Sequence, residues 1–277
     1  MVTLGFKTDK ITRFRTALLN SGRLSVDAFL EYRDDFLDIG KTAIATALLP
    51  YETTSGLFRA WTVKRMRPEP IQADNWYDLF FGVLSDGIPF DEFDKHKLSI
   101  ITFNYDRSIE RYLFTSLKNS YGKTDEECGE KLRKIEIIHV HGSLGPLSWQ
   151  PSPDGLPWIP YDSGTDPKVI KLAAQNIKII HEGTADTPEF TQARNILLNS
   201  TKVLFLGFGY HPANLKRLGI GTLKIKHNNI KGTSLGLSYE RKENIRRLIP
   251  ILTELQCYLQ AEDVYTFLHE HVSFGEL

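Results

Sequence analysis

Three clusters of polar and glycine residues have the side chains and backbones that suit chemistry on a bound ligand. They are Asn104 with Tyr105 and Asp106, His141 with Gly142 and Ser143, and Gly207 with Phe208, Gly209, Tyr210 and His211. An asparagine can orient a water molecule, an aspartate can accept hydrogen bonds from an amide, and a histidine that titrates near neutrality can act as a base. Glycines let a backbone approach a phosphate closely. The clusters therefore predict a ligand site.

Each cluster follows a short apolar run that predicts a buried β-strand, over residues 98–103, 135–140 and 202–206. Weaker strands are predicted over residues 177–180 and 233–237, and helices over residues 108–117 and 239–248. Strands that alternate with helices predict a parallel sheet covered on both faces. Because ligands bind at the carboxyl ends of such strands, we expect the three clusters to lie at one edge of the sheet.

The first ninety or so residues have a helical pattern. Apolar positions at three- and four-residue steps predict one or two amphipathic helices over residues 25–49, and further helices are predicted over residues 53–66 and 75–84. Ser25 suits a helix start, and Gly40 predicts a kink or a break. The aromatic residues of the last helix are expected to be core residues rather than a cofactor site.

Each cluster also has a simpler interpretation. Asn104 and Asp106 would serve equally well as caps of the following helix. His141 would fit a buried, hydrogen-bonded core histidine, and a Gly-x-Gly such as Gly207 with Gly209 is a weak signal without a third glycine. The proline-rich residues 146–167 predict a lid or binding loop, and His181 with Glu182 is a candidate to line the same cleft.

The composition excludes several classes of protein. Among 277 residues, 34 are basic and 34 acidic, and 41% are hydrophobic, which excludes a disordered chain and a typical nucleic-acid binder. No run predicts a membrane span or a secretory signal, so we expect a cytoplasmic protein. The two cysteines lie far apart, and His139 with His141 lacks carboxylate neighbours, so no metal site is expected.

The three clusters together resemble the successive motifs of the sirtuin-like domain, in the divergent branch found in bacterial anti-phage defence proteins. The resemblance extends over about residues 20–250 and rests on Thr102-Phe103-Asn104-Tyr105-Asp106, on His141-Gly142, and on Leu206-Gly207-Phe208-Gly209. It implies an α/β fold: a Rossmann-like, mostly parallel sheet flanked by helices, with a helical N-terminal insertion. It also implies that NAD is the substrate and that the bond between nicotinamide and ribose is broken.

The resemblance implies roles for individual residues. Asn104 would orient the water or ribose at the reacting carbon, and His141 would act on the ribose hydroxyls, which makes these two the catalytic candidates. Asp106 would contact the nicotinamide amide. The full set of implied NAD-binding residues is Thr102, Phe103, Asp106, Gly142, Gly207, Phe208, Gly209 and Thr233. Phe208 and the absence of a following serine depart from the family's glycine-small-serine turn.

The family's opening strand and glycine-rich loop have no counterpart between Met1 and Lys41. We therefore expect a single sirtuin-like domain over residues 1–277 that lacks its first nucleotide-binding strand, with a helical part at 10–95 and a strand–helix part at 96–277. Three explanations stay open: the natural start lies upstream, the chain is a degenerate copy that binds NAD poorly, or another chain completes the sheet.

Three functions are weighed. The leading one is an NAD hydrolase of anti-phage defence, and the alternative is an inactive module that binds NAD or ADP-ribose as a sensor or assembly partner. Nucleic-acid binding rests on residues 216–247, with nine basic and two acidic residues, and a solvated helix face explains that segment better. The expected partners are NAD or ADP-ribose and either further copies of the chain or a defence-system protein, with no membrane.

Overall fold

The computed structural model describes residues 1–58, 75–152, 155–179, 187–220, 230–248, 259–260 and 262–272. The chain divides into two compact units, Met1–Glu69 with Ile100–Ala185, and Pro70–Ser99 with Asp186–Leu277. The division cuts across the predicted helical part, because its last helix belongs to the second unit. The single domain over residues 1–277 stays a prediction.

The first unit begins with helices. They are η1 (Val2–Leu4), α1 (Thr8–Leu19), α2 (Val26–Leu30), η2 (Asp34–Phe36), α3 (Leu37–Leu48), η3 (Leu49–Tyr51) and α4 (Thr54–Leu57). Ser25 starts α2 as predicted, because its side chain accepts a hydrogen bond from the Ala28 N–H. The predicted helix over residues 53–66 is described only as α4, since residues 59–66 lie outside the described ranges.

The predicted break at Gly40 is wrong. Helix α3 continues through this residue, and a Cβ added at Gly40 would lie 2.5 Å from Leu30 Cδ1. The glycine therefore serves close packing of α3 against the end of α2 rather than the end of a helix.

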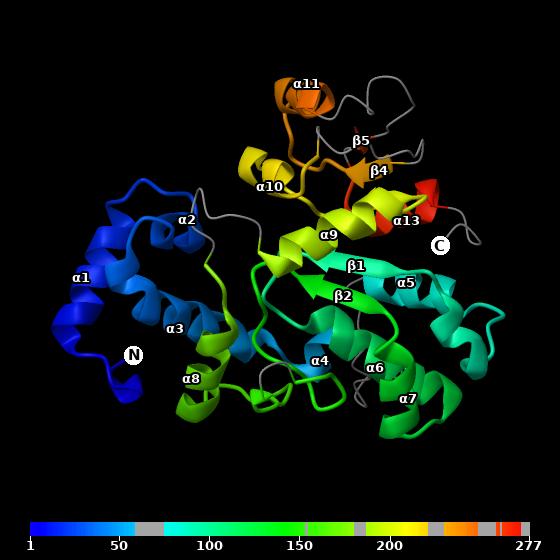
Figure 1. Cartoon of the computed structure of the whole chain (residues 1–277), viewed down its shortest axis with the longest axis horizontal. Helices are drawn as coiled ribbons and strands as arrows, with labels where there is room; N and C mark the ends of the chain where they lie inside the picture. The colour runs from blue at the N-terminus through cyan, green and yellow to red at the C-terminus, as the bar shows by residue number, and fades with distance from the viewer. Residues whose placement is uncertain are drawn as a thin grey trace, which may run out of the picture. The chain divides into compact units, whose positions relative to one another are not determined.

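The first unit continues with β1 (Ser99–Thr102), α6 (Ser108–Tyr121), α7 (Asp125–Leu132), β2 (Glu136–His139) and α8 (Pro167–Asn176). The predicted strands over residues 98–103 and 135–140 are confirmed, and β1 pairs with β2 (Figure 1). The weak strand predicted from residue 177 is replaced, in the described residues, by a single antiparallel bridge between Gly142 and Ile177.

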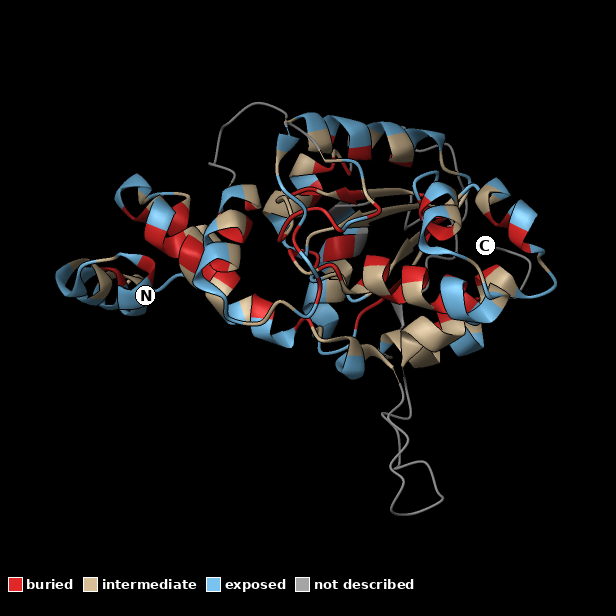
Figure 2. Cartoon of the chain, turned by 90° about the horizontal axis from the view of Figure 1, so that it is seen from below, coloured by how far each residue is buried: buried red, intermediate tan, exposed pale blue. Residues whose placement is uncertain are grey.

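One core of this unit contains residues from η1, α1, α2, η2, α3, η3 and α8. In Figure 2 these helices carry buried and exposed residues on opposite sides, as amphipathic helices do, and α3 packs against α8. Three phenylalanines from α1, α2 and η2 meet edge to face or stacked, with the ring centroids of Phe14 and Phe36 5.6 Å apart. The core reaches Tyr105 and Leu144, which follow β1 and β2. The helical segment is therefore part of the packing that holds the two strand ends.

The second unit contains a three-stranded parallel sheet with helices. Its elements are α5 (Trp76–Ser85), η4 (Phe90–Lys95), α9 (Pro188–Asn199), β3 (Val203–Phe205), α10 (Pro212–Arg217), β4 (Ile230–Thr233), α11 (Tyr239–Leu248), β5 (Leu259–Gln260) and α13 (Val264–His271). The strand order is β3-β4-β5, with Phe205 opposite Gly232. The strand over residues 202–206 is confirmed, whereas the strand predicted over 233–237 is displaced, because β4 ends at Thr233.

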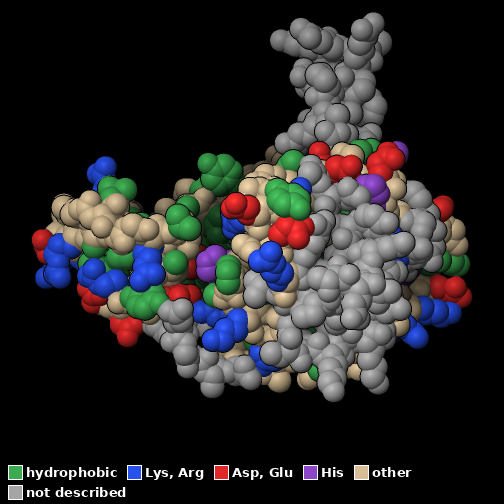
Figure 3. All heavy atoms as spheres, turned by 90° about the horizontal axis from the view of Figure 1, so that it is seen from above, with side chains coloured by type: hydrophobic (Ala, Val, Ile, Leu, Met, Phe, Trp, Pro, Cys, Tyr) green, Lys and Arg blue, Asp and Glu red, His purple; other side chains and the backbone are tan. Residues whose placement is uncertain are grey.

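The α/β class and the helical N-terminal region are confirmed. The described strands form a two-stranded and a three-stranded sheet, and the continuous Rossmann-like sheet stays a prediction. Among the described residues, none of the helices combines the length and the apolar character needed to cross a membrane. Basic and acidic side chains are interspersed on the face shown in Figure 3, in keeping with the net charge of zero.

Candidate functional site

The loop that follows β1 presents one polar side chain to solvent. The N–H of Asn104 donates to the Thr102 hydroxyl at 3.1 Å, which turns the chain out of the strand. The side chain of Asn104 is exposed and makes no hydrogen bond to any described residue. The carbonyl of Tyr105 accepts from the Leu144 N–H at 2.9 Å, which ties this loop to the segment after β2.

The next residue, Tyr105, is anchored from a distant helix. Its hydroxyl donates to a carboxylate oxygen of Asp27 in α2. Burial, together with the neighbouring Asp27 carboxylate, raises the pKa of Tyr105 far above its ordinary value, so the phenol keeps its proton and stays a donor. The helical segment thus helps to fix the loop.

Asp106 supports the start of the helix that follows. One of its carboxylate oxygens accepts from the Ser108 N–H at 3.2 Å and also from the Ser108 hydroxyl, at the start of α6. Arg107 occupies the N-cap position itself, so Asp106 acts from one residue earlier, and its hydrogen bonds to Ser108 fit the simpler interpretation of a residue that supports the helix start. Its predicted contact with a nicotinamide amide stays a prediction.

Arg107 is the largest fully buried side chain of the described residues. Its guanidinium pairs with the Glu52 carboxylate and donates to the carbonyls of Gly145 at 3.2 Å and Ile159 at 2.6 Å. The Glu52 carboxylate also accepts from the Arg107 N–H at 2.7 Å. The sequence analysis missed this pair, because its partners are 55 residues apart in the sequence.

The predicted catalytic residues come together at the ends of β1 and β2. The ring of His141 lies against the rings on both sides of Asn104 in the sequence, with centroid distances of 5.6 Å to Phe103 and 6.4 Å to Tyr105. His141 is half-buried and the Asn104 side chain is exposed. The structure thus confirms that the first two clusters share one strand-end region.

Gly142 is required by the chain's own backbone. Its φ of 75° lies in the left-handed region, and a Cβ there would be 2.1 Å from the carbonyl oxygen of Asn176. The Lys178 N–H also donates to the His141 carbonyl at 2.8 Å. The end of α8 therefore packs directly on the backbone after β2, a contact that accounts for the glycine without a ligand.

His139 and Glu110 form a buried pair that the sequence analysis did not find. The ring Nε2 lies 2.6 Å from Glu110 Oε1, and Nδ1 lies 2.8 Å from the carbonyl oxygen of Asn104. Burial alone lowers the pKa of an imidazole, but Glu110, the Asn104 carbonyl and Asp106 outweigh it and raise the pKa of His139. The spacing of His139 and His141 on the predicted strand did not indicate that Glu110 would be the partner of His139.

In the second unit, two of the predicted NAD-binding residues are in contact. The Gly207 N–H donates to the Thr233 hydroxyl at 2.8 Å, which joins the turn after β3 to the end of β4. Gly207 has a left-handed φ of 62°, and Gly207 and Gly209 are exposed. These two glycines offer backbone without side chains to a ligand, the property that a close approach to a ribose or phosphate needs.

Phe208 belongs to an aromatic cluster after β3. Its ring centroid lies 5.5 Å from that of Phe205 and 5.1 Å from that of Tyr210. The Tyr210 hydroxyl lies over Gly232 of β4, where an added Cβ would be only 2.3 Å away. Phe208, the departure from the family's turn, therefore packs against neighbouring rings.

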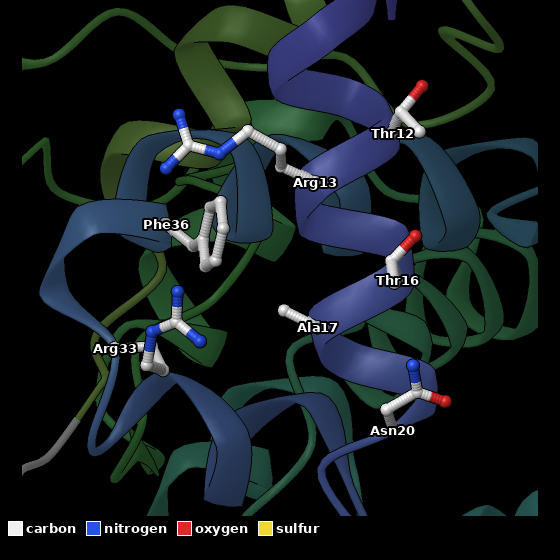
Figure 4. A pocket seen from close by; sticks show the side chains of 7 residues that line it. All are labelled: Thr12, Arg13, Thr16, Ala17, Asn20, Arg33 and Phe36. Carbon is white, nitrogen blue, oxygen red and sulfur yellow. The ribbon is translucent and has the colours of Figure 1, made fainter.

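The described residues offer no metal centre, since nowhere among them do three His, Cys, Asp or Glu side chains gather closely enough to hold an ion. His181 and Glu182 lie outside the described residues. A pocket of about 370 Å³ in the N-terminal helices contains none of the predicted site residues. Figure 4 shows Arg13 and Arg33 converging there on the ring of Phe36.

Residues 98–228, just under half of the chain, match the family model described as a SIR2-like domain. This segment runs from β1 to the residues before β4, so it includes both catalytic candidates and the turn after β3, but not Thr233 or the N-terminal helices. The match is consistent with an NAD-related, sirtuin-like activity. Neither a curated protein nor a solved structure matches the chain.

Proposed function

We propose that this protein is a sirtuin-like NAD hydrolase that cleaves the nicotinamide–ribose bond in bacterial anti-phage defence. Two findings support the proposal: the SIR2-like segment, and the exposed Asn104 side chain on a loop whose other residues are anchored. The second observation carries it. An exposed amide on a loop anchored by hydrogen bonds, beside a half-buried histidine, is preorganised to act on a ligand.

The reaction breaks the bond between C1′ of the ribose and the nicotinamide nitrogen. Neutral nicotinamide leaves with the bonding electrons, and the ribose becomes an oxocarbenium-like species. Water then forms the new bond to C1′ and releases one proton to solvent. In this proposal the side-chain amide of Asn104 orients the water. His141 forms hydrogen bonds with the ribose hydroxyls and can accept a proton from them.

The remaining predicted residues would bind the rest of NAD. Asp106 would keep its support of the α6 start and contact the nicotinamide amide. Thr102, Phe103 and Gly142 would line the same end of β1 and β2. The turn of Gly207, Phe208 and Gly209, held by Thr233, would lie near the adenosine ribose, and no metal takes part in the proposed reaction.

The test is nicotinamide release from NAD by the full chain, followed by chromatography. Asn104→Ala is expected to lower the rate by about 100-fold or more, the usual loss when one oriented polar group is removed from a reacting centre. Asn119→Ala is the matched control, because Asn119 is also an exposed asparagine but donates only to the Thr115 carbonyl in α6. The absence of release by the wild-type chain, alone and with its defence partner, would contradict the proposal.

A specific observation favours a second candidate, an inactive module that binds NAD or ADP-ribose as a sensor or assembly partner. Residues 1–48 fold as helices where the resemblance implies a strand and a glycine-rich phosphate loop. Calorimetry with NAD and with ADP-ribose discriminates the two functions. Binding without turnover, unchanged by His141→Ala, is the result expected of the sensor.

A further inference from the structure

The buried pair of His139 and Glu110 lies directly behind the loop that carries Asn104. The His139 side chain is 11% exposed and that of Glu110 is 1% exposed. The ring bridges two elements: Nε2 faces Glu110 of α6, and Nδ1 faces the backbone carbonyl of Asn104. The other oxygen of Glu110 is buried and has no hydrogen-bond partner among the described residues. The ring is thus the one described hydrogen-bond partner of this carboxylate.

The two contacts dictate where the protons must be. A carbonyl oxygen only accepts hydrogen bonds, so Nδ1 must carry a proton to hold Asn104. A carboxylate likewise accepts, so a second proton lies between Nε2 and Glu110 Oε1. The charged groups that face the ring are Glu110 from α6 and Asp106 from the loop, and both favour the protonated imidazole.

We propose that His139 and Glu110 are positioning residues of the site, and that the protonated ring fixes the direction in which the Asn104 amide is presented. The part of this proposal that is tested by activity rests on the proposed NAD cleavage. His139 reaches the reacting atoms only through the Asn104 backbone, so its contribution is orientation rather than proton transfer to substrate. When the ring loses its second proton, the Nε2 lone pair faces a carboxylate, and the repulsion loosens the hold on Asn104.

Glu110→Gln separates this role from simple packing. The glutamine amide has nearly the same shape, and by rotating it can donate to a neutral Nε2 or accept from a protonated one. Both protonation states of His139 then keep the Asn104 carbonyl bonded. The rate of the wild-type chain is expected to fall as the pH rises through the raised pKa of His139. Over the same pH range, the rate of the E110Q variant should stay within about twofold of the rate that this variant has at neutral pH.

A second variant removes the hold altogether. Replacing both polar partners, as His139→Phe with Glu110→Leu, avoids leaving an unpaired buried charge. The rate at saturating NAD is expected to fall about 10-fold or more with a smaller change in KM, because the effect acts at the reacting carbon. Circular dichroism checks that the double variant is folded. If the double variant does not fold, the E110Q variant alone tests the proposal.

Nuclear magnetic resonance tests the pair without relying on turnover. Long-range nitrogen–proton spectra of the full chain should show both ring nitrogens of His139 still protonated above the pH at which an unperturbed histidine titrates, and E110Q should lower the pH at which the His139 ring titrates. The control is Glu270→Gln, which removes the carboxylate from an exposed pair, His269 Nδ1 to Glu270 Oε1 at 2.8 Å, and should leave the His139 and Asn104 signals unchanged.

Several results would overturn the proposal. One is a His139 ring that carries a proton on only one nitrogen and that titrates at the same pH in the wild-type chain and in E110Q. Another is an unchanged alkaline fall of the rate in E110Q, or Asn104 amide signals that do not move in the double variant. If the wild-type chain releases no nicotinamide, the proposed function fails, and the resonance measurements alone then decide whether the pair holds Asn104.

Discussion

The loop after β1 and the turn after β3 are held by different means. Residues 104–107 are anchored by side chains distant in the sequence, namely Asp27, Glu52 and His139. Among the described residues, the turn that begins at Gly207 is held by the Thr233 hydroxyl and by a local aromatic cluster. The first arrangement fixes the direction of one exposed side chain, whereas the second leaves exposed backbone.

This difference matches two kinds of task. Chemistry at a reacting carbon requires a polar group fixed to within a fraction of an ångström, and such precision comes from supporting hydrogen bonds. Contact with a ribose or a phosphate needs accessible N–H groups and room for the ligand, which glycines supply. Substitutions of the residues that support these two regions should therefore differ in how much unfolding free energy they cost and in the cause of that cost.

The largest effect is expected where the loop after β1 is most deeply anchored. Arg107→Leu leaves the Glu52 carboxylate, 3% exposed, without its cation, and should cost about 3–5 kcal/mol of unfolding free energy. Arg33→Leu removes one partner of the exposed pair Arg33–Asp35 and should change stability far less. Urea unfolding of both variants measures the difference. Equal losses would mean that the buried pair is not what anchors the loop.

The glycines of the two regions should respond unequally to alanine. Both Gly142 and Gly207 have left-handed φ angles, which cost an alanine about 1–2 kcal/mol. Gly142→Ala also drives its Cβ to 2.1 Å from the Asn176 carbonyl oxygen, whereas the nearest atom at Gly207 is Val264 Cγ2 at 3.7 Å. Gly142→Ala should therefore cost roughly 2–5 kcal/mol, the strain plus an overpacking cost, and Gly207→Ala only the strain. Similar thermal denaturation of the two variants would refute the comparison.

A smaller effect is expected at the Thr233 hydroxyl, which accepts a hydrogen bond from the turn after β3. Thr233→Val keeps the shape but removes the acceptor of the Gly207 N–H, at a cost of about 1 kcal/mol. Thr42→Val is the control, because that buried hydroxyl only donates to the Asp38 carbonyl within α3, which also accepts a helical hydrogen bond. Its cost should be lower. A neutral Thr233→Val would show that the turn needs no side-chain support.

The elements could be predicted because their signals are local. Short apolar runs predicted β1, β2 and β3, and the Ser25 cap predicted the start of α2, since strand burial and capping depend on neighbours in the sequence. The prediction of a break at Gly40 was wrong because a glycine inside a helix can also allow close packing, here against Leu30. The three-residue β3 and two-residue β5 show why strand bounds are harder to predict than strand existence.

The site was predictable only in part. The residue types of Asn104 and His141 pointed to a site, and the structure places His141 against both neighbours of Asn104. The supports of that site were invisible, because Glu52 and Glu110 meet their partners only after the chain has folded over 55 and 29 residues. Buried charged partners carry no periodic pattern, so a single sequence does not reveal them.

The smallest effect on stability is expected at Asn104 itself. Its side chain is exposed and without a hydrogen bond to the described residues, so Asn104→Ala should change the unfolding free energy by no more than about 0.5 kcal/mol. Asn75→Ala is the matched comparison, because Asn75 caps α5 by accepting from the Tyr77 N–H, and its loss should cost about 1 kcal/mol. A cost at Asn104 equal to that at Asn75 would mean that Asn104 is a structural residue. A stable Asn104→Ala variant that no longer cleaves NAD is the pairing expected of a residue whose side chain acts on a ligand rather than on the fold.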